Sequence, residues 1–185
     1  NPPANVAGSF AVAPPASTIS CSALTGHAWN DAPCDPGCAS NSGAPVTLTY
    51  LSGPATASGT LVTPNDVGDV VLRADVAATG GYTEGTTTVT LTLGPATPAL
   101  SFPNPGTHLV SEERIKLQAT SSAGSPAIEF YVLDGPGGTI GDEYFTTRTG
   151  VVTVRAVQPS NERWNLAIAD QVFTIEKGNP TFYLV

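Results

Sequence analysis

The same residue pattern occurs twice in this chain, in residues 46–98 and 128–180, at a spacing of 82 positions. The two copies align without a gap. The matched residues are a Gly-Pro pair, a later Gly, an Arg-Ala pair and a final Pro: Gly53-Pro54 and Gly135-Pro136, Gly68 and Gly150, Arg73-Ala74 and Arg155-Ala156, Pro98 and Pro180. A fixed repeat period indicates a tandem array of similar folding units.

The repeat predicts the domain organisation. Each unit spans about 80–95 residues, which is enough for one modest hydrophobic core. We expect one domain in residues 1–96 and a second in residues 97–178. Residues 179–185 restate the register of the segment that begins at Thr97, so we expect a third repeat to start there. The linker from Gly94 to Pro98 is short and contains two prolines, which predicts units placed end to end.

Composition and periodicity favour an all-β chain. Only 12% of the residues are charged, and Gly, Pro, Thr and Val are abundant whereas strong helix formers are scarce. Apolar residues recur at every second position, as in Val152, Val154 and Ala156. Each unit carries roughly seven such short runs with turn signals between them, the pattern of a β-sandwich. For the second unit we expect a core of Phe102, Leu117, Phe130, Val132, Val154 and Phe173.

Charge excludes some function classes. The chain has seven Lys and Arg residues against 15 acidic residues, a formal net charge of −8. Scattered single cations offer no basic stripe to neutralise phosphates, so nucleic acid is not an expected partner. No apolar run is long enough to cross a bilayer, so we do not expect membrane insertion.

These features resemble the bacterial immunoglobulin-like (Big/MBG-type) repeats of large surface and secreted proteins. The residues that carry the resemblance are the two Gly-Pro pairs, the matched runs GDVVLRA at 68–74 and GVVTVRA at 150–156, the aromatic residues Tyr82 and Trp164, and the closing Lys177-Gly178-Asn179-Pro180. The resemblance implies two tandem immunoglobulin-like β-sandwich domains in an extracellular or cell-surface bacterial protein. It also implies a structural spacer role in an adhesin-like protein, without enzymatic activity or cofactor and with adjoining repeats as partners.

Cys21, Cys34 and Cys38 are the only cysteines. Pro36-Gly37 reverses the chain between Cys34 and Cys38, which favours a disulfide between these two, with Cys21 as a buried free thiol. A bridge from Cys21 to either of the other two cysteines is an alternative. A zinc site of three thiolates and His27 is a further alternative, although its spacing matches no common zinc motif.

We expect residues 25–38 to be extra in the first unit, because Ile19-Ser20-Cys21 aligns with the later run that begins at Ile115. This predicted insertion holds two of the three cysteines. It also holds an aromatic side chain among polar ones: His27, Trp29, Asn30 and Asp31. Such a group suits contact with a carbohydrate or a protein. The alternative function is therefore a carbohydrate- or host-protein-binding module that uses the loop around Trp29.

Catalytic and metal signatures are missing from the sequence. His27 and His108 lie in different units and no nucleophile signature accompanies either one. The acidic pairs Asp66/Asp69 and Asp142/Glu143 provide too few oxygens for calcium and suit solvated turns. Tyr82 and Trp164 lie at matched positions, which favours a packing role for both.

Overall fold

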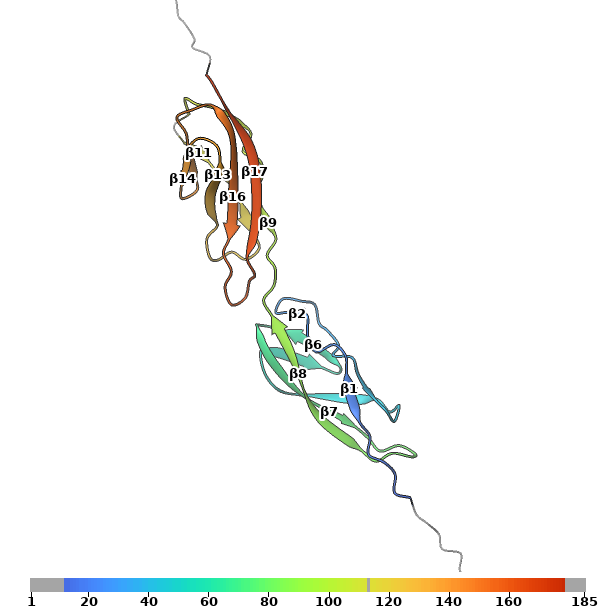
Figure 1. The fold of residues 1–185 in the computed structure, drawn as a ribbon. Helices are drawn as coiled ribbons and strands as arrows, with labels where there is room; N and C mark the ends of the chain where they lie inside the picture. Colours follow the sequence, from blue (N-terminus) through green and yellow to red (C-terminus); the bar gives the residue numbers. More distant parts are fainter. Residues whose placement is uncertain (1–11, 113, 179–185) are drawn as a thin grey trace, which may run out of the picture. The chain divides into compact units, whose positions relative to one another are not determined.

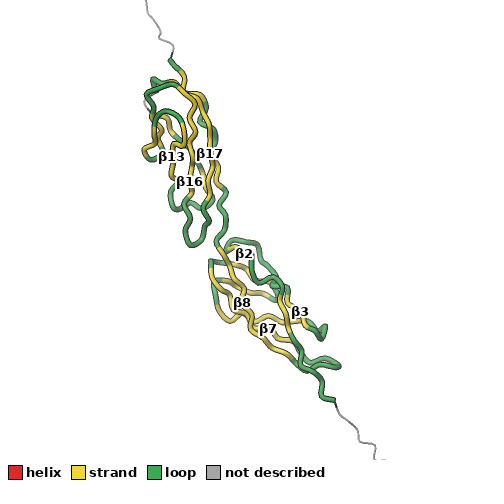
Figure 2. The backbone as a smooth tube through the Cα atoms, viewed as in Figure 1, coloured by secondary structure: helices red, strands yellow, loops and turns green. Residues whose placement is uncertain are grey.

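The computed structural model describes residues 12–112 and 114–178 of the 185-residue chain. All regular secondary structure in these ranges is β-strand, and none of it is helical (Figures 1 and 2). The chain divides between Gly94 and Pro95 into two compact units, called unit 1 and unit 2 below. The predicted third repeat at 179–185 lies outside the described residues.

Unit 1 is built from two layers of strands. Its larger sheet has the order β2-β8-β7-β4, and its second layer consists of the pairs β1–β3 and β5–β6. The strands are β1 (Ile19–Cys21), β2 (His27–Ala28), β3 (Cys38–Ser40), β4 (Val46–Ser52), β5 (Ala55–Ser58), β6 (Leu61–Pro64), β7 (Gly68–Val76) and β8 (Gly85–Gly94). The long antiparallel pair β7–β8 dominates the larger sheet (Figure 1).

Unit 2 repeats this arrangement. Its larger sheet has the order β10-β17-β16-β13, and its second layer consists of β11-β15-β14 and the pair β12–β9. The strands are β9 (Leu100–Ser101), β10 (Thr107–Leu109), β11 (Ile115–Lys116), β12 (Thr120–Ser121), β13 (Glu129–Asp134), β14 (Gly138–Ile140), β15 (Glu143–Phe145), β16 (Gly150–Gln158) and β17 (Ala167–Glu176). The predicted all-β, immunoglobulin-like sandwich class is confirmed.

Each unit has its own hydrophobic core between the layers. In unit 1 the core joins Val62 from β6 to Leu72 from β7 and Leu91 from β8. The predicted core residues of unit 2 are buried, except that Val132 is half-buried against the same cluster. Phe102 and Phe130 meet edge to face there, with ring centroids 5.4 Å apart. Alternation along β7 and β16 therefore delivers the apolar side chains to the core, as the sequence predicts.

The 82-residue period is kept in the backbone as well as in the sequence. Strands β7 and β16 have bounds exactly one period apart, and so do β8 and β17. The register of β4 against β7 shifts between Tyr50 and Ser52, and the register of β13 against β16 shifts between Val132 and Asp134. These two β-bulges are also one period apart. The repeat thus fixes irregular geometry as well as strand positions.

The structure corrects the alignment at the start of unit 1. Strand β1 pairs with β3 as β9 pairs with β12, so Ile19–Cys21 is a first strand and not the counterpart of the run from Ile115. The expected continuous strand from Ile115 to Ala119 is interrupted between β11 and β12. The segment between the paired strands β9 and β12 of unit 2 is of similar length to the segment between β1 and β3 of unit 1. Residues 25–38 are therefore not an insertion. Two-residue alternation alone does not identify which partner a short strand pairs with, and the error follows from that.

Candidate binding site

The predicted binding residues of unit 1 lie on a short segment docked against the larger sheet. Strand β2 runs parallel to the end of β8, with His27 opposite Leu93, and the Trp29 backbone N–H donates to the Gly94 carbonyl at 3.0 Å. The side chains of His27 and Trp29 are half-buried, whereas Asn30 and Asp31 are exposed. The segment therefore presents two polar side chains beside an aromatic one, on a backbone held by the sheet.

Asp31 has a local structural role within this segment. Its carboxylate accepts a hydrogen bond from the Ala28 N–H at 2.8 Å, and its own N–H donates to the Ala28 carbonyl at 3.1 Å. One Asp31 oxygen lies 4.0 Å from Nδ1 of His27. The carboxylate thus closes a tight turn after β2, which reduces its capacity to bind a ligand.

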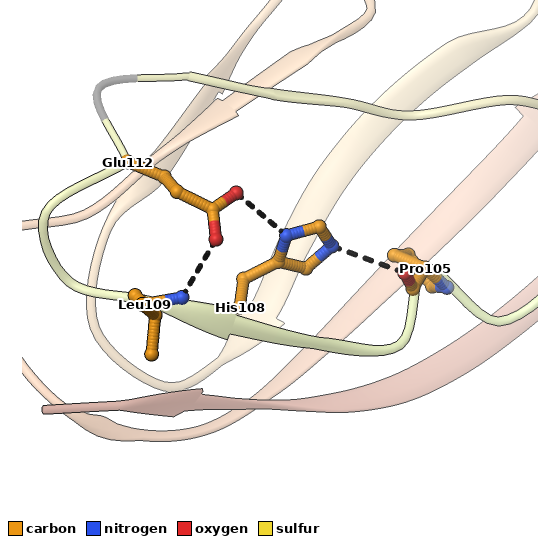
Figure 3. Close-up of polar contacts among 4 residues, drawn as sticks. All are labelled: Pro105, His108, Leu109 and Glu112. Carbon is orange, nitrogen blue, oxygen red and sulfur yellow. Dashed lines mark hydrogen bonds and ion pairs between the residues drawn. The ribbon is translucent and has the colours of Figure 1, made fainter. Parts of the chain in front are cut away.

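Unit 2 contains the same motif around His108, which the sequence analysis did not detect. Strand β10 runs parallel to β17 with His108 opposite Ile175, the residue one period after Leu93. The Leu109 N–H donates to the Glu112 carboxylate at 2.9 Å (Figure 3). The Glu112 N–H donates to the Leu109 carbonyl at 3.0 Å. A His followed four residues later by an acid therefore marks the turn after this strand in both units. The two histidines are 81 positions apart, one less than the repeat period. An alignment of the two units that allowed a one-residue gap would have matched them.

The His108 ring is held on both sides by acceptors. Nδ1 lies 2.8 Å from a Glu112 carboxylate oxygen, and Nε2 lies 3.0 Å from the Pro105 carbonyl oxygen (Figure 3). Both contacts are hydrogen bonds only when both ring nitrogens carry a proton, that is, in the imidazolium form. The Leu109 N–H, together with His108, holds the pKa of Glu112 below its ordinary value. In unit 1 the corresponding Nε2 of His27 is buried and has no hydrogen-bond partner among the described residues.

The cysteine pairing differs from the prediction. Cys21 and Cys38 form the disulfide, since they lie directly opposite each other on β1 and β3 with their Cα atoms 3.9 Å apart. The predicted Cys34–Cys38 bridge is therefore wrong, although the chain does turn at Pro36-Gly37. The zinc alternative is also wrong, because two of its three sulfurs are joined.

Cys34 is a free, half-buried thiol that lies against the core of unit 1. It packs on the buried cluster, and its backbone exchanges hydrogen bonds of 2.8 and 2.9 Å with Val62. Ile115 pairs in the same way with Tyr144, one period after Val62, so Cys34 takes the place of a buried Ile. Burial is the largest cause of the raised pKa of this thiol. A thiol with a raised pKa carries less thiolate and is therefore a poor nucleophile.

The other predicted features have ordinary structural surroundings. Trp164 is 9% exposed, which supports packing, whereas Tyr82 is only half-buried. No group of three or more His, Cys, Asp or Glu side chains in the described ranges is placed to hold a metal ion. Within those ranges there is also no helix that is long and apolar enough to cross a membrane.

Comparisons with known proteins give no family. No family model matches the chain, and no curated protein matches it. Among solved structures, the chain is similar to a crystal structure of Drosophila N-cadherin EC1-4, with 10% sequence identity over 83% of this chain and a TM-score of 0.34. It is also similar to the titin domains z1z2 in complex with telethonin, with 18% identity over 74% of this chain and 83% of that chain and a TM-score of 0.33. The chain spans 46% of the cadherin chain. At these values the likeness carries no argument about function, and the strand pairings and cores described above remain the basis for the fold.

Proposed function

We propose that this chain is a structural spacer segment of a bacterial cell-surface or secreted adhesin-like protein, with no enzymatic activity. The observation that carries the proposal is the repetition of a self-contained unit. Strands, bulges and core positions recur after 82 residues, and each unit buries its own apolar cluster. When every unit folds around its own core, an array becomes longer by the addition of units. A spacer of this kind needs no catalytic site.

The junction between the units supports this role. Gly94 accepts a backbone hydrogen bond from Trp29 within unit 1, and Ala96 exchanges backbone hydrogen bonds of 2.8 and 2.9 Å with Asn165 and Arg163 within unit 2. Only Pro95 lies between these two anchored residues, and its ring fixes φ. Linkers that contain proline are semi-rigid, which suits a spacer.

The extracellular part of the proposal has separate support. The disulfide between Cys21 and Cys38 suits an oxidising compartment. The bacterial surface assignment derives from the residue patterns that resemble bacterial immunoglobulin-like repeats. The partners expected for a spacer are adjoining repeats of the same type.

Small-angle X-ray scattering of this chain tests the spacer proposal. A compact globule of this length has a radius of gyration of about 16 Å. Two 90-residue sandwiches placed end to end, with strands about 33 Å long, give a value above about 20 Å. A radius near the compact value would contradict the proposal.

A second candidate function is recognition of a carbohydrate or protein by the segment around Trp29. It is favoured by one observation: the half-buried indole lies beside exposed Asn30 on a backbone fixed by β8. Glycan and host-matrix arrays probed with the chain and with Trp29→Ala test it, and Tyr82→Ala serves as a control for loss of an aromatic elsewhere in unit 1. Binding by the wild type that is lost only in Trp29→Ala supports recognition. Equal signals from all three proteins contradict it.

A further inference from the structure

The outer face of the larger sheet in unit 2 is unusually apolar. Alternation sends Val152, Val154 and Ala156 into the core, so their neighbours on β16 and on the adjoining β13 and β17 face outward. Five large apolar side chains of these strands are about half exposed: Tyr131 (48%), Leu133 (48%), Val151 (58%), Ile168 (52%) and Val172 (52%). We call these five residues the outer face. Single exposed apolar residues are ordinary, but a group of them on one sheet marks an interaction surface.

Unit 1 shows that the fold does not require this face to be apolar. One period earlier, the positions of Tyr131, Ile168 and Val172 carry Thr49, Thr86 and Thr90, and the position of Val151 carries Asp69. Only Leu133 has an apolar counterpart, Leu51. The backbones of the two sheets match strand for strand. The apolar character therefore belongs to unit 2 itself.

An ion pair lies at the centre of the outer face, and the exposed acids Glu129 and Asp134 lie beside it on β13. Arg155 of β16 donates two hydrogen bonds of 2.8 Å to Asp170 of β17, directly opposite it and between the apolar residues. When the two-fold axis of a dimer lies in the plane of the contact and passes over this pair along the strands, Arg155 of one copy faces Asp170 of the other. Opposite charges side by side at the centre of an apolar face thus suit an isologous contact, in which both partners use the same surface.

We propose that unit 2 associates with a second copy of this chain through the outer face, as a symmetric dimer. Two sheets pack face to face when both present apolar side chains. In the described part of unit 1 the corresponding face has one apolar residue among these five positions, Leu51, so the sheet that matches the outer face is that of a second copy. This inference goes beyond the spacer function, since a spacer needs no lateral contact.

The size of the outer face sets the strength of the contact. Three strands about 4.8 Å apart, over a length of about 25 Å, cover roughly 350 Å² in each copy. A standard stable interface buries about 800 Å² in each partner. The contact is less than half the standard size, so the dimer is weak. The acidic charge of the chain opposes the approach of a second copy, so salt strengthens the association by screening.

Sedimentation equilibrium of the chain from about 10 µM to 1 mM tests the proposal. We expect the mean mass to rise toward that of a dimer, and to rise further in 0.5 M NaCl than in 0.05 M NaCl. The variant V151D/I168T/V172T places on unit 2 the residues that unit 1 carries at the same backbone positions. It should remain monomeric, with dimerisation weakened at least tenfold. The reverse graft D69V/T86I/T90V gives unit 1 the same apolar residues, and we expect it to produce species larger than a dimer.

Ile140→Thr is the matched control, because Ile140 is 60% exposed in unit 2 but lies on β14 in the other layer. Its association should equal that of the wild type. A thermal melt of each variant establishes whether unit 2 is folded. If the triple variant is unfolded, the single variant Val172→Thr takes its place. A wild type that stays monomeric at 1 mM overturns the proposal. An association that weakens with salt also overturns it. The same holds for an association that V151D/I168T/V172T leaves intact, or that Ile140→Thr reduces as much as this triple variant does.

Discussion

The Gly-Pro pairs that first reveal the repeat offer a sharp test of the fold. Gly135 has φ of +102°, and a Cβ built there would lie against the carbonyl oxygen of Val151 and 2.8 Å from the Cα of Val152. Gly53 has φ of +119°, and its Cβ would meet Asp69 and Val70, one period earlier, in the same way. In both units the glycine therefore lets the chain cross directly over the backbone of the central strand.

We expect Gly135→Ala to destabilise unit 2 by about 3–5 kcal/mol. The positive φ alone costs about 1–2 kcal/mol for an L-residue. The remainder comes from the clash, because the obstructing atoms are backbone of β16 and cannot move without disturbing the core. Gly141→Ala is the control, since Gly141 also has positive φ (+60°) but an added Cβ there meets no atom within 4 Å. It carries the conformational cost without the clash.

Differential scanning calorimetry of the intact chain measures both effects. A change of 1 kcal/mol shifts the melting temperature of a domain of this size by about 4–8 °C. Gly135→Ala should therefore lower the transition of unit 2 by at least about 12 °C, and Gly141→Ala should lower it by at most about two-thirds of the shift that Gly135→Ala causes. Gly53→Ala should lower the transition of unit 1 to the same extent as Gly135→Ala lowers that of unit 2. Equal shifts from Gly135→Ala and Gly141→Ala would refute the reasoning, because the close approach would then cost nothing.

Three further outcomes are expected. Phe130→Ala should cost about 3–5 kcal/mol in urea melts, the usual range for a buried Phe, and a loss under about 1 kcal/mol would show that the side chain does not fill the core. Reduction of the Cys21–Cys38 disulfide, whose cysteines are 17 residues apart, should destabilise unit 1 by about 3 kcal/mol and leave the transition of unit 2 in place; a loss from both units would contradict their independence. The folded-state pKa of Glu112 is depressed. Its ionised side chain therefore adds stability to unit 2 above the unfolded pKa of 4.5, and this stability is lost as the pH falls from there through the folded pKa. Unit 2 of the wild type should therefore lose more stability between pH 5 and pH 3 than Glu112→Gln does, and equal losses would contradict this role.

The repeat predicted the strands of the larger sheets well. Inward residues such as Leu72 and Val154 alternate regularly along nine-residue strands, so their pattern is long enough to be unambiguous. The same reasoning failed for Ile19–Cys21 and for the run from Ile115. These strands have two or three residues, and their positions are set by backbone partners in a distant part of the chain rather than by their own alternation.

The disulfide error has the same origin. Cys34 and Cys38 are close in sequence with a turn between them, and this favoured a local bridge. Cys38 faces Cys21 across a strand pair, however, and the backbone of Cys34 is bonded to Val62 on another strand. Local turn chemistry was predicted correctly and the long-range pairing was not. The His-acid turn after β2 and β10 was missed for a related reason, since its two copies align only when the first strands are assigned correctly.

The two units together indicate where the specific function of such a chain is encoded. Along β7 and β16 the matched inward positions stay apolar in both units, as with Val70 and Val152, except that Gln158 stands at the position of Val76. Matched outward positions differ freely, as with Asp69 and Val151, because the fold imposes nothing on them. Even where the residue is the same, its partner differs. Arg73 pairs with Asp75 on its own strand, and Arg155 pairs with Asp170 on the neighbouring strand. Likeness between the units therefore reports the requirements of the sandwich. Differences at exposed positions, such as those on the outer face of unit 2, are free to encode a specific function.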